Sequence, residues 1–253
     1  MERRRILGTD LEVSPICFGM MYGSESRRKP ELKADALRCG LDAGINFIHS
    51  CQEYGTWPVL AEVLDNWPQA RQLTHAIKMI FPEDEDENRF YPDKFRQRVE
   101  DHLVALRTDR IDILQYQWRV APGTDLEPLE LFRSVAEEMV ATFQRLRDEG
   151  KAGYLMVFPS ASCKMEVIDS GHFSGMISVC NLARLDYGAL RSELERRKWG
   201  CSASGRCRTA CSRTSMNPIP RTATIGAAAR NTRRSTRSVS VSSNSSARRS
   251  VLR

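Results

Sequence analysis

Three titratable side chains, His49, Tyr54 and Lys78, stand at or just beyond the ends of short apolar runs in the sequence. An imidazole, a phenol and an ammonium group gathered at neighbouring strand ends can move protons, so they are candidates for acid/base catalysis. His49 is also a candidate metal ligand, although histidines in pockets are more often only hydrogen-bonded. Cys51 and His75 add no metal-ligand spacing to His49, and we therefore expect no metal site.

Short apolar runs rich in β-branched residues alternate with amphipathic helical stretches through the first 200 residues. This alternation is typical of repeated βα units around a parallel sheet. A hairpin over Arg4–Leu7 and Glu12–Val13 is predicted to plug the base of a barrel. The predicted strands are Ile16–Met20, Asn46–Ser50, Leu73–Lys78, Ile111–Gln117, Gly153–Val157 and Met176–Asn181.

Helices are predicted between these strands from apolar spacing and from their end signals. Phe95, Val99 and Leu103 share one apolar face, and Gly44 and Gly150 follow two of the stretches as natural stops. The predicted helices are Lys33–Ala43, Val59–Asn66, Pro92–Leu106, Leu129–Glu149, Cys163–Ser170 and Ala189–Lys198. About six βα units are recognisable, and eight close a barrel. The sequence therefore predicts an α/β fold of the (β/α)8 TIM-barrel type that is incomplete.

The positive charge of the chain is confined to its last part. The 253 residues carry a net charge of +6, but residues 201–253 contain eleven Arg and no Lys, Asp or Glu, so residues 1–200 carry −5. The last segment also holds twelve Ser and six Thr and few large apolar residues. Such a composition cannot offset chain entropy by burial. We predict a barrel-like domain over residues 1–200 and a disordered basic tail over 201–253, with strands seven and eight missing.

The cellular compartment of the protein is predicted mainly from targeting features that the sequence lacks. It has no run of about 18 apolar residues that would span a membrane, and its basic start leads into Gly8-Thr9-Asp10 rather than an apolar signal region. Cysteines such as Cys17, Cys39 and Cys180 sit inside apolar runs, as buried thiols do in a reducing compartment. We expect a cytoplasmic protein without a membrane partner.

Several stretches, in the same order along the chain, resemble the aldo-keto reductase family. They are Arg4–Pro15 with Phe18-Gly19, Leu41–Ile48, Tyr54-Gly55, Leu106–Gln115 and Asp148–Lys151. The resemblance covers roughly residues 3–198. It implies a (β/α)8 barrel that reduces the carbonyl of a small molecule with NADPH, and it places the site at the C-terminal ends of the strands.

The resemblance also assigns roles to four positions. Members of the family use a Tyr as the acid, a Lys that makes this Tyr a better proton donor, an Asp paired with the Lys, and a His that orients the carbonyl. Tyr54 and Lys78 match the first two positions, whereas His49 stands at the Asp position and Gln117 at the His position. The amide of Gln117 can still donate a hydrogen bond to a carbonyl. Lys78 is expected to lack its carboxylate partner.

The cofactor side departs further from the family pattern. The resemblance places Gly19, Met20 and Asn181 beside NADPH, but Phe158 and Pro159 stand where the family has Ser-Asn after the fifth strand. Pro159 has no backbone donor and Phe158 fills a polar space. These departures predict a reductase with impaired cofactor binding, a pseudoenzyme in the extreme case.

Three alternatives stay open at this point. The first is a non-redox enzyme that uses His49, Tyr54 and Lys78 for acid/base work, and the second is a non-catalytic binding protein on the same barrel. The third, nucleic-acid binding by the tail, is not favoured, because the tail has no regular Arg-Ser repeat and no aromatic residue for base stacking. Two open sheet edges predict self-association. For the origin of the tail, we favour the hypothesis of a frameshift near residue 199 over a genuine basic tail.

Overall fold

A curved parallel sheet organises the part of the chain that the structure describes. This computed structural model describes residues 1–22, 29–81, 89–118, 127–158, 164–179 and 191–204. A hairpin of β1 (Arg4–Arg5) and β2 (Glu12–Val13) comes first. The sheet then runs in chain order through β3 (Phe18–Gly19), β4 (Phe47–Cys51), β5 (Thr74–Phe81), β6 (Ile111–Trp118), β7 (Ala152–Val157), β8 (Gly175–Val179) and β9 (Gly200–Ser204).

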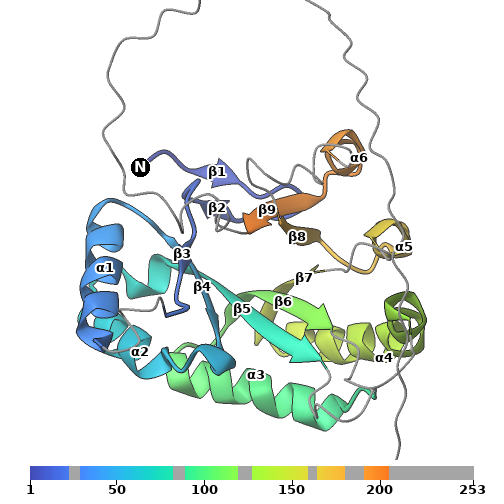
Figure 1. Ribbon diagram of the computed structural model, residues 1–253, viewed down its shortest axis with the longest axis horizontal. Helices are drawn as coiled ribbons and strands as arrows, with labels where there is room; N and C mark the ends of the chain where they lie inside the picture. The colour runs from blue at the N-terminus through green and yellow to red at the C-terminus, as the bar shows by residue number, and fades with distance from the viewer. Residues whose placement is uncertain (23–28, 82–88, 119–126, 159–163, 180–190, 205–253) are drawn as a thin grey trace, which may run out of the picture. The chain divides into compact units, whose positions relative to one another are not determined.

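Every neighbouring pair of strands in this sheet is parallel, so the connecting helices cross over its outer side (Figure 1). The helices are α1 (Pro30–Asp42), α2 (Trp57–Asp65), α3 (Pro92–Leu106), α4 (Pro128–Asp148), α5 (Lys164–Ser170) and α6 (Arg191–Arg196). Short 3-10 segments lie at η1 (Gln52–Tyr54) and η2 (Ala70–Gln72). The first four α-helices carry proline within their first two positions, where its missing N–H costs no hydrogen bond.

Side chains from the two faces of the sheet enter two separate cores. The larger core lies between the sheet and its helices and contains outward-facing side chains such as Ile48, Ile77 and Leu114. The smaller core lies inside the curve and contains Val13, Phe47, Ala76, Ile113 and Met156. Because side chains alternate along a strand, the inward positions of β4, β5 and β6 continue from this core toward their C-terminal ends. These inward-facing side chains lead to the candidate site.

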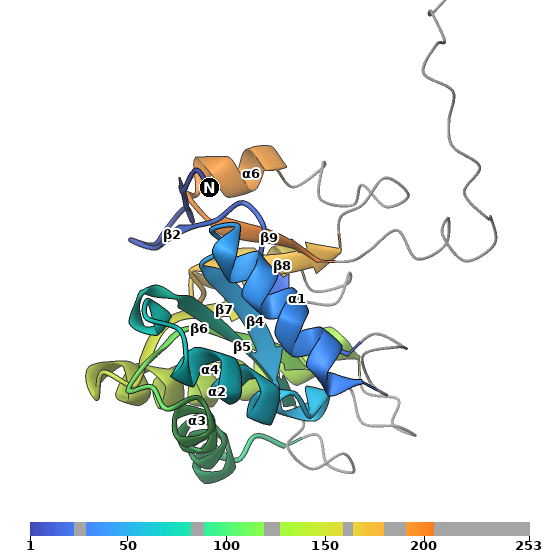
Figure 2. The ribbon, with the colours of Figure 1, turned by 90° about the vertical axis from the view of Figure 1, so that its left-hand side faces the viewer.

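The N-terminal hairpin packs against the base of the curved sheet, as predicted. Ser14 N–H donates to Asn46 Oδ1 at 2.7 Å, and the Tyr154 hydroxyl donates to Asp10 Oδ1 at 2.8 Å. In both ribbon views the hairpin lies beside β9 and α6 (Figure 2). A cavity of about 630 Å³ inside the curve is lined by hairpin and interior residues, including Val13, Phe47 and Cys201.

The prediction that strand seven is missing was wrong. β9 follows α6 and pairs in parallel with β8 from Gly175↔Gly200 to Val179↔Ser204. Its sequence, Gly-Cys-Ser-Ala-Ser, contains no large apolar residue, and the strand is specified by backbone pairing that composition does not reveal. The two backbones approach so closely that a Cβ built on Gly175 would lie 2.4 Å from the Gly200 carbonyl oxygen. The predicted tail over 201–253 was wrong for residues 201–204, which belong to β9. The rest of the predicted tail, residues 205–253, and with it the predicted absence of strand eight, lies outside the described residues.

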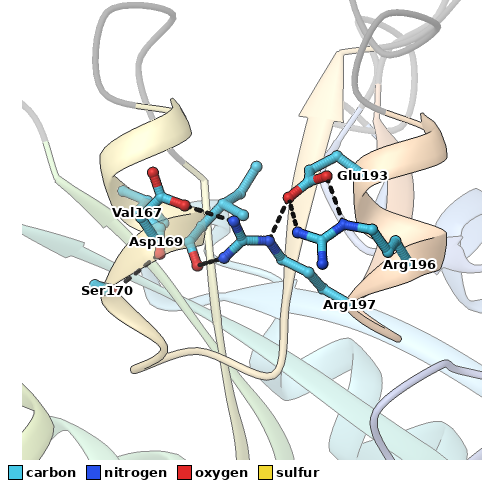
Figure 3. Close-up of polar contacts among 7 residues, drawn as sticks. Val167, Asp169, Ser170, Glu193, Arg196 and Arg197 are labelled. Carbon is cyan, nitrogen blue, oxygen red and sulfur yellow. Dashed lines mark hydrogen bonds and ion pairs between the residues drawn. The ribbon is translucent and has the colours of Figure 1, made fainter.

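An ion-pair network joins the last two helices of the described chain (Figure 3). The Arg197 guanidinium donates to Glu193 Oε1 at 2.5 Å and to Asp169 Oδ1 at 2.7 Å. It also donates to the Ile168 carbonyl at 3.3 Å, and Arg196 forms a second pair with Glu193. Arg197 thereby ties the end of α6 to α5 across β8.

The six predicted strands and six predicted helices are all present, with ends shifted by a few residues. The strand predicted at Ile16–Met20 is reduced to β3, Phe18–Gly19. Within the described residues, β3 and β9 each have a paired neighbour on one side only. The incomplete (β/α)8 fold is therefore confirmed, with seven strands in place of six.

Candidate active site

The candidate site lies at the C-terminal ends of β4, β5 and β6, and the chain reaches it through a tight turn. β4 ends at Cys51 and passes directly into η1, whose last residue is Tyr54. Gly55 follows with φ +63°, and its N–H donates to the Gln52 carbonyl at 3.1 Å. A side chain at position 55 would be strained in this left-handed conformation. The turn thus holds Tyr54 at the edge of the sheet.

Lys78 reaches this edge from β5 and meets the ring of Tyr54. The Lys78 Nζ lies 5.0 Å from the centroid of the Tyr54 ring, and the lysine is buried. An ammonium within about 6 Å of an aromatic face is attracted by the ring. The structure therefore brings together the two residues that the sequence predicted as the acid and its activating cation.

Lys78 has a carboxylate partner, and the expectation that it would lack one was wrong. Glu53 Oε2 lies 3.6 Å from the Lys78 Nζ. Glu53 precedes Tyr54 on η1, four residues after the position where the family pattern places an Asp. The expectation failed because it considered only the aligned position, which His49 occupies, and not the turn that follows it.

His49 faces the same interior but carries no charge at neutral pH. Its Nε2 lies 2.7 Å from Gln115 Oε1, so Nε2 carries the hydrogen and Nδ1 keeps a lone pair. Burial lowers the pKa of His49 to about 4; the Lys78 charge lowers it too, whereas the Gln115 hydrogen bond acts in the opposite direction. The His49 and Tyr54 ring centroids are 6.1 Å apart. The neutral imidazole can accept a proton at Nδ1.

Gln117 lies near the end of β6, one residue before the last, and pairs in register with Ile80 of β5. It is half-buried, and strand alternation places it on the same face as Gln115. The predicted role of Gln117 in orienting a carbonyl fits this place. Gln115 was not singled out from the sequence, although an amide at an inward position of an apolar strand was the available signal. It is only 2% exposed and fixes the tautomer of His49.

The cofactor side of the site fits a nicotinamide in part. A Cβ built on Gly19 has no atom of the described residues within 4 Å, so the described part of the chain leaves space beside the end of β3. Met20 is fully buried in the larger core, and its N–H donates to the His49 carbonyl at 2.8 Å, which leaves its backbone carbonyl for any contact. Phe158 is half-buried at the end of β7. Asn181 and Pro159 lie outside the described residues.

Lys33 supports the loop beside Gly19 from the outer layer. Its Nζ donates to the Gly19 carbonyl at 2.7 Å and to the Met21 carbonyl at 3.0 Å. The same ammonium lies 4.9 Å from the centre of the Phe18 ring. The helix α1 thus fixes the backbone at the end of β3, a role that the sequence did not predict.

The described residues contain neither a metal-binding cluster nor a membrane-spanning helix. No group of three or more His, Cys, Asp or Glu side chains there is placed to hold a metal ion. No helix in the same residues is long and apolar enough to cross a membrane.

The fold is an incomplete parallel (β/α)8 barrel, and it carries the phenol of Tyr54 and the ammonium group of Lys78 at the C-terminal edge of its sheet. Similarity to known sequences then specifies the family. The sequence model of the aldo/keto reductase family matches residues 15–170. The chain belongs to this family. It is 32% identical over 124 residues to a 6-dehydroglucose reductase of Novosphingobium aromaticivorans, a match that spans 44% of this chain and 40% of the relative.

Solved structures with the same fold cover more of the chain at lower identity. An aldo-keto reductase of Bacillus halodurans in its holo form superposes with a TM-score of 0.66 at 17% identity, over 87% of this chain and 71% of that one. The glycerol dehydrogenase of Gluconobacter oxydans gives 0.62 at 23%, over 86% and 68%. An aldo/keto reductase of Klebsiella pneumoniae, solved with NADP and acetate, gives 0.60 at 21%, over 78% and 65%.

Proposed function

We propose that this protein reduces the carbonyl group of a small molecule with NADPH, and does so slowly. The observation that carries the proposal is the meeting of Tyr54 with Lys78 at the C-terminal edge of the sheet, 5.0 Å from ring centroid to Nζ. The family membership and the NADP-bound relative support the choice of cofactor.

The protein's own residues would act on the carbonyl oxygen. NADPH supplies the hydride that the carbonyl carbon receives. Tyr54 donates the proton that converts the oxygen to a hydroxyl, and the Lys78 ammonium stabilises the phenolate that remains until solvent reprotonates it. Gln117 donates a hydrogen bond that orients the carbonyl. The residues around Gly19 would hold the nicotinamide end of the cofactor.

Three departures support a slow reaction. His49 is neutral where the family pattern has a carboxylate, Gln117 replaces a histidine, and Phe158 brings an apolar ring where polar side chains hold the cofactor. We expect saturable NADPH binding by fluorescence titration, and turnover of small aldehydes below about 1 per second, the low end of ordinary kcat values. Absence of NADPH binding at millimolar concentration would contradict the proposal.

The same experiment tests a non-redox alternative on the same barrel. The neutral His49, with a lone pair at Nδ1 near Tyr54, forms a base and acid pair that needs no nicotinamide. This alternative predicts no NADPH binding, even when the region after residue 199 is replaced by an intact barrel sequence. A non-catalytic binding protein would show neither NADPH binding nor turnover.

The basic segment at the end of the chain needs an explanation of its own. We infer that residues 201–253, apart from the β9 pairing, form a basic tail or the out-of-frame end of a barrel. The gene's nucleotide sequence tests the second idea, because both shifted frames after codon 199 can be translated and searched for a barrel-like reading. Sedimentation of the protein tests whether the open edges at β3 and β9 lead to self-association.

A further inference from the structure

We propose that Glu53 is a positioning residue that holds the Lys78 ammonium against the ring of Tyr54. The inference rests on the proposed function for its effect on turnover, and on the structure alone for its effect on Lys78. Glu53 itself does not touch the carbonyl in this scheme. It acts through Lys78.

Lys78 requires a counter-charge because its side chain is only 10% exposed. A buried ammonium without a partner is costly. The groups that face it are the Tyr54 ring, the neutral His49 and the carboxylate of Glu53. Among the described residues, the ion pair that Lys78 forms is the one with Glu53, at 3.6 Å.

Other carboxylates in this part of the molecule have different partners. Asp112 accepts a hydrogen bond from the His75 N–H at 2.8 Å, at the N-terminal end of the sheet. Glu62 on α2 pairs with Arg38 on α1 at 2.9 Å. Among the described residues, the carboxylate that pairs with Lys78 therefore comes from η1.

The location of Glu53 explains how it would set the geometry. Glu53 and Tyr54 are adjacent in a three-residue turn that Gly55 closes, so the carboxylate and the phenol move together. The attraction between Glu53 and Lys78 therefore keeps the ammonium near the phenol. It also offsets the positive charge of the ammonium. Because the Glu53 side chain is 48% exposed, solvent weakens the pair, and its effect should be severalfold rather than thousandfold.

The first test measures Lys78 directly and needs no turnover. Trinitrobenzenesulfonate reacts with neutral amines, and the rate at each lysine can be read by peptide mass spectrometry. Glu53→Gln keeps the size of the side chain but removes the carboxylate that holds the Lys78 amine in place. We expect labelling of Lys78 to become about three- to fivefold faster, with labelling of Lys94 unchanged in the same sample. Glu62→Gln, which removes a carboxylate from a different ion pair, should leave Lys78 unchanged.

The second test moves the carboxylate. His49 on β4 stands opposite Ala76 of β5, two residues before Lys78 and on the same face of the sheet, so an aspartate at position 49 would face the ammonium. In the double variant His49→Asp/Glu53→Gln, labelling of Lys78 should return to within about twofold of the wild-type rate. Circular dichroism melting of each variant identifies any loss of folding. If His49→Asp unfolds the protein, the labelling rate of Lys78 in the single variant Glu53→Gln decides the test.

Turnover gives a third readout where the protein is active. Glu53→Gln should lower kcat by about three- to fivefold and leave KM unchanged, because it alters the acid and not the substrate contacts. Faster labelling of Lys78 without any NADPH-dependent turnover in the wild type would support the role of Glu53 and contradict the proposed reduction. Unchanged labelling in Glu53→Gln overturns the inference, whatever the turnover.

Discussion

The two halves of the curved sheet are built in different ways. In the first half, β3 to β6, the two longest strands have eight residues. Toward the C-terminal ends of these strands, the inward-facing positions carry titratable or amide side chains, among them His49, Lys78 and Gln115. From β7 to β9 the strands are five or six residues long, and they are joined by close glycine backbones and by ion pairs between helices. In the proposed function the chemistry thus belongs to the first half, and the second half would supply the wall against which the cofactor lies.

This contrast explains how a family member can keep its acid while its cofactor side diverges. The pairing of Tyr54 with Lys78 depends on η1 and β5, in the first half of the sheet. The Phe158 side of the site depends on β7 and the segments after it. Because the two sets of residues lie on different strands, we expect substitutions around Phe158 to leave the pairing of Tyr54 with Lys78 in place.

The largest expected effect is on turnover and comes from the first half. Tyr54→Phe removes the proton donor and keeps the ring that Lys78 contacts, so we expect kcat to fall by about 100-fold or more. NADPH affinity should stay the same, as measured by fluorescence titration. Tyr154→Phe is the matched control, because it removes a phenol that bonds Asp10 at the base. A Tyr54→Phe enzyme with wild-type kcat would assign the acid to another group.

Acid should destabilise the first half before the second. Burial lowers the pKa values of His49, His75 and His102 to about 4. The unfolded chain binds these protons near pH 6.5, so stability is lost as the pH falls from about 6.5 toward 4, on the order of 3 kcal/mol for each histidine. Urea unfolding at pH 7.5, 5.5 and 4.5 measures the loss.

Two substitutions sharpen this expectation. His102→Gln removes one buried titrating group and should make unfolding less sensitive to acid. His172→Gln changes an exposed histidine after α5 and should have no such effect. Hydrogen exchange at pH 5 should reveal β4, β5 and α3 opening first. Equal acid sensitivity in both variants would mean that buried histidines do not set the acid limit.

A smaller loss is expected where the second half depends on glycine. Gly175→Ala places a Cβ against the Gly200 carbonyl, and moving two backbones apart should cost on the order of 1–3 kcal/mol. The loss should appear in urea unfolding, with faster hydrogen exchange in residues 200–204. Gly19→Ala is the control for stability, because its Cβ would enter open space. Wild-type stability in Gly175→Ala would show that β9 is not held against β8.

Sequence patterns predicted the parts of this molecule that depend on local apolar periodicity. They located six of the seven strands of the sheet and brought Tyr54, Lys78 and His49 to one edge. They missed β9, because five small residues pair through their backbone, and they missed Gln115, whose inward direction depends on strand register. They also missed Glu53 as the partner of Lys78, since an ion pair across a turn depends on three-dimensional placement. Two positions that the family resemblance places beside the cofactor, Pro159 and Asn181, lie outside the described part of the chain.

The smallest expected effect tests the ion pairs of the second half. Arg197→Met keeps the aliphatic stem and removes the bonds to Glu193, Asp169 and the Ile168 carbonyl. Because surface ion pairs contribute little, we expect hydrogen exchange in α5 and α6 to become about threefold faster, with no change in β4 or β5. Arg191→Met is the control, because Arg191 pairs with Glu195 within α6. Equal effects from both substitutions would mean that the bridge between α5 and α6 adds nothing beyond helix-internal pairs. An effect that extended to β4 would mean that the two halves of the sheet are coupled after all.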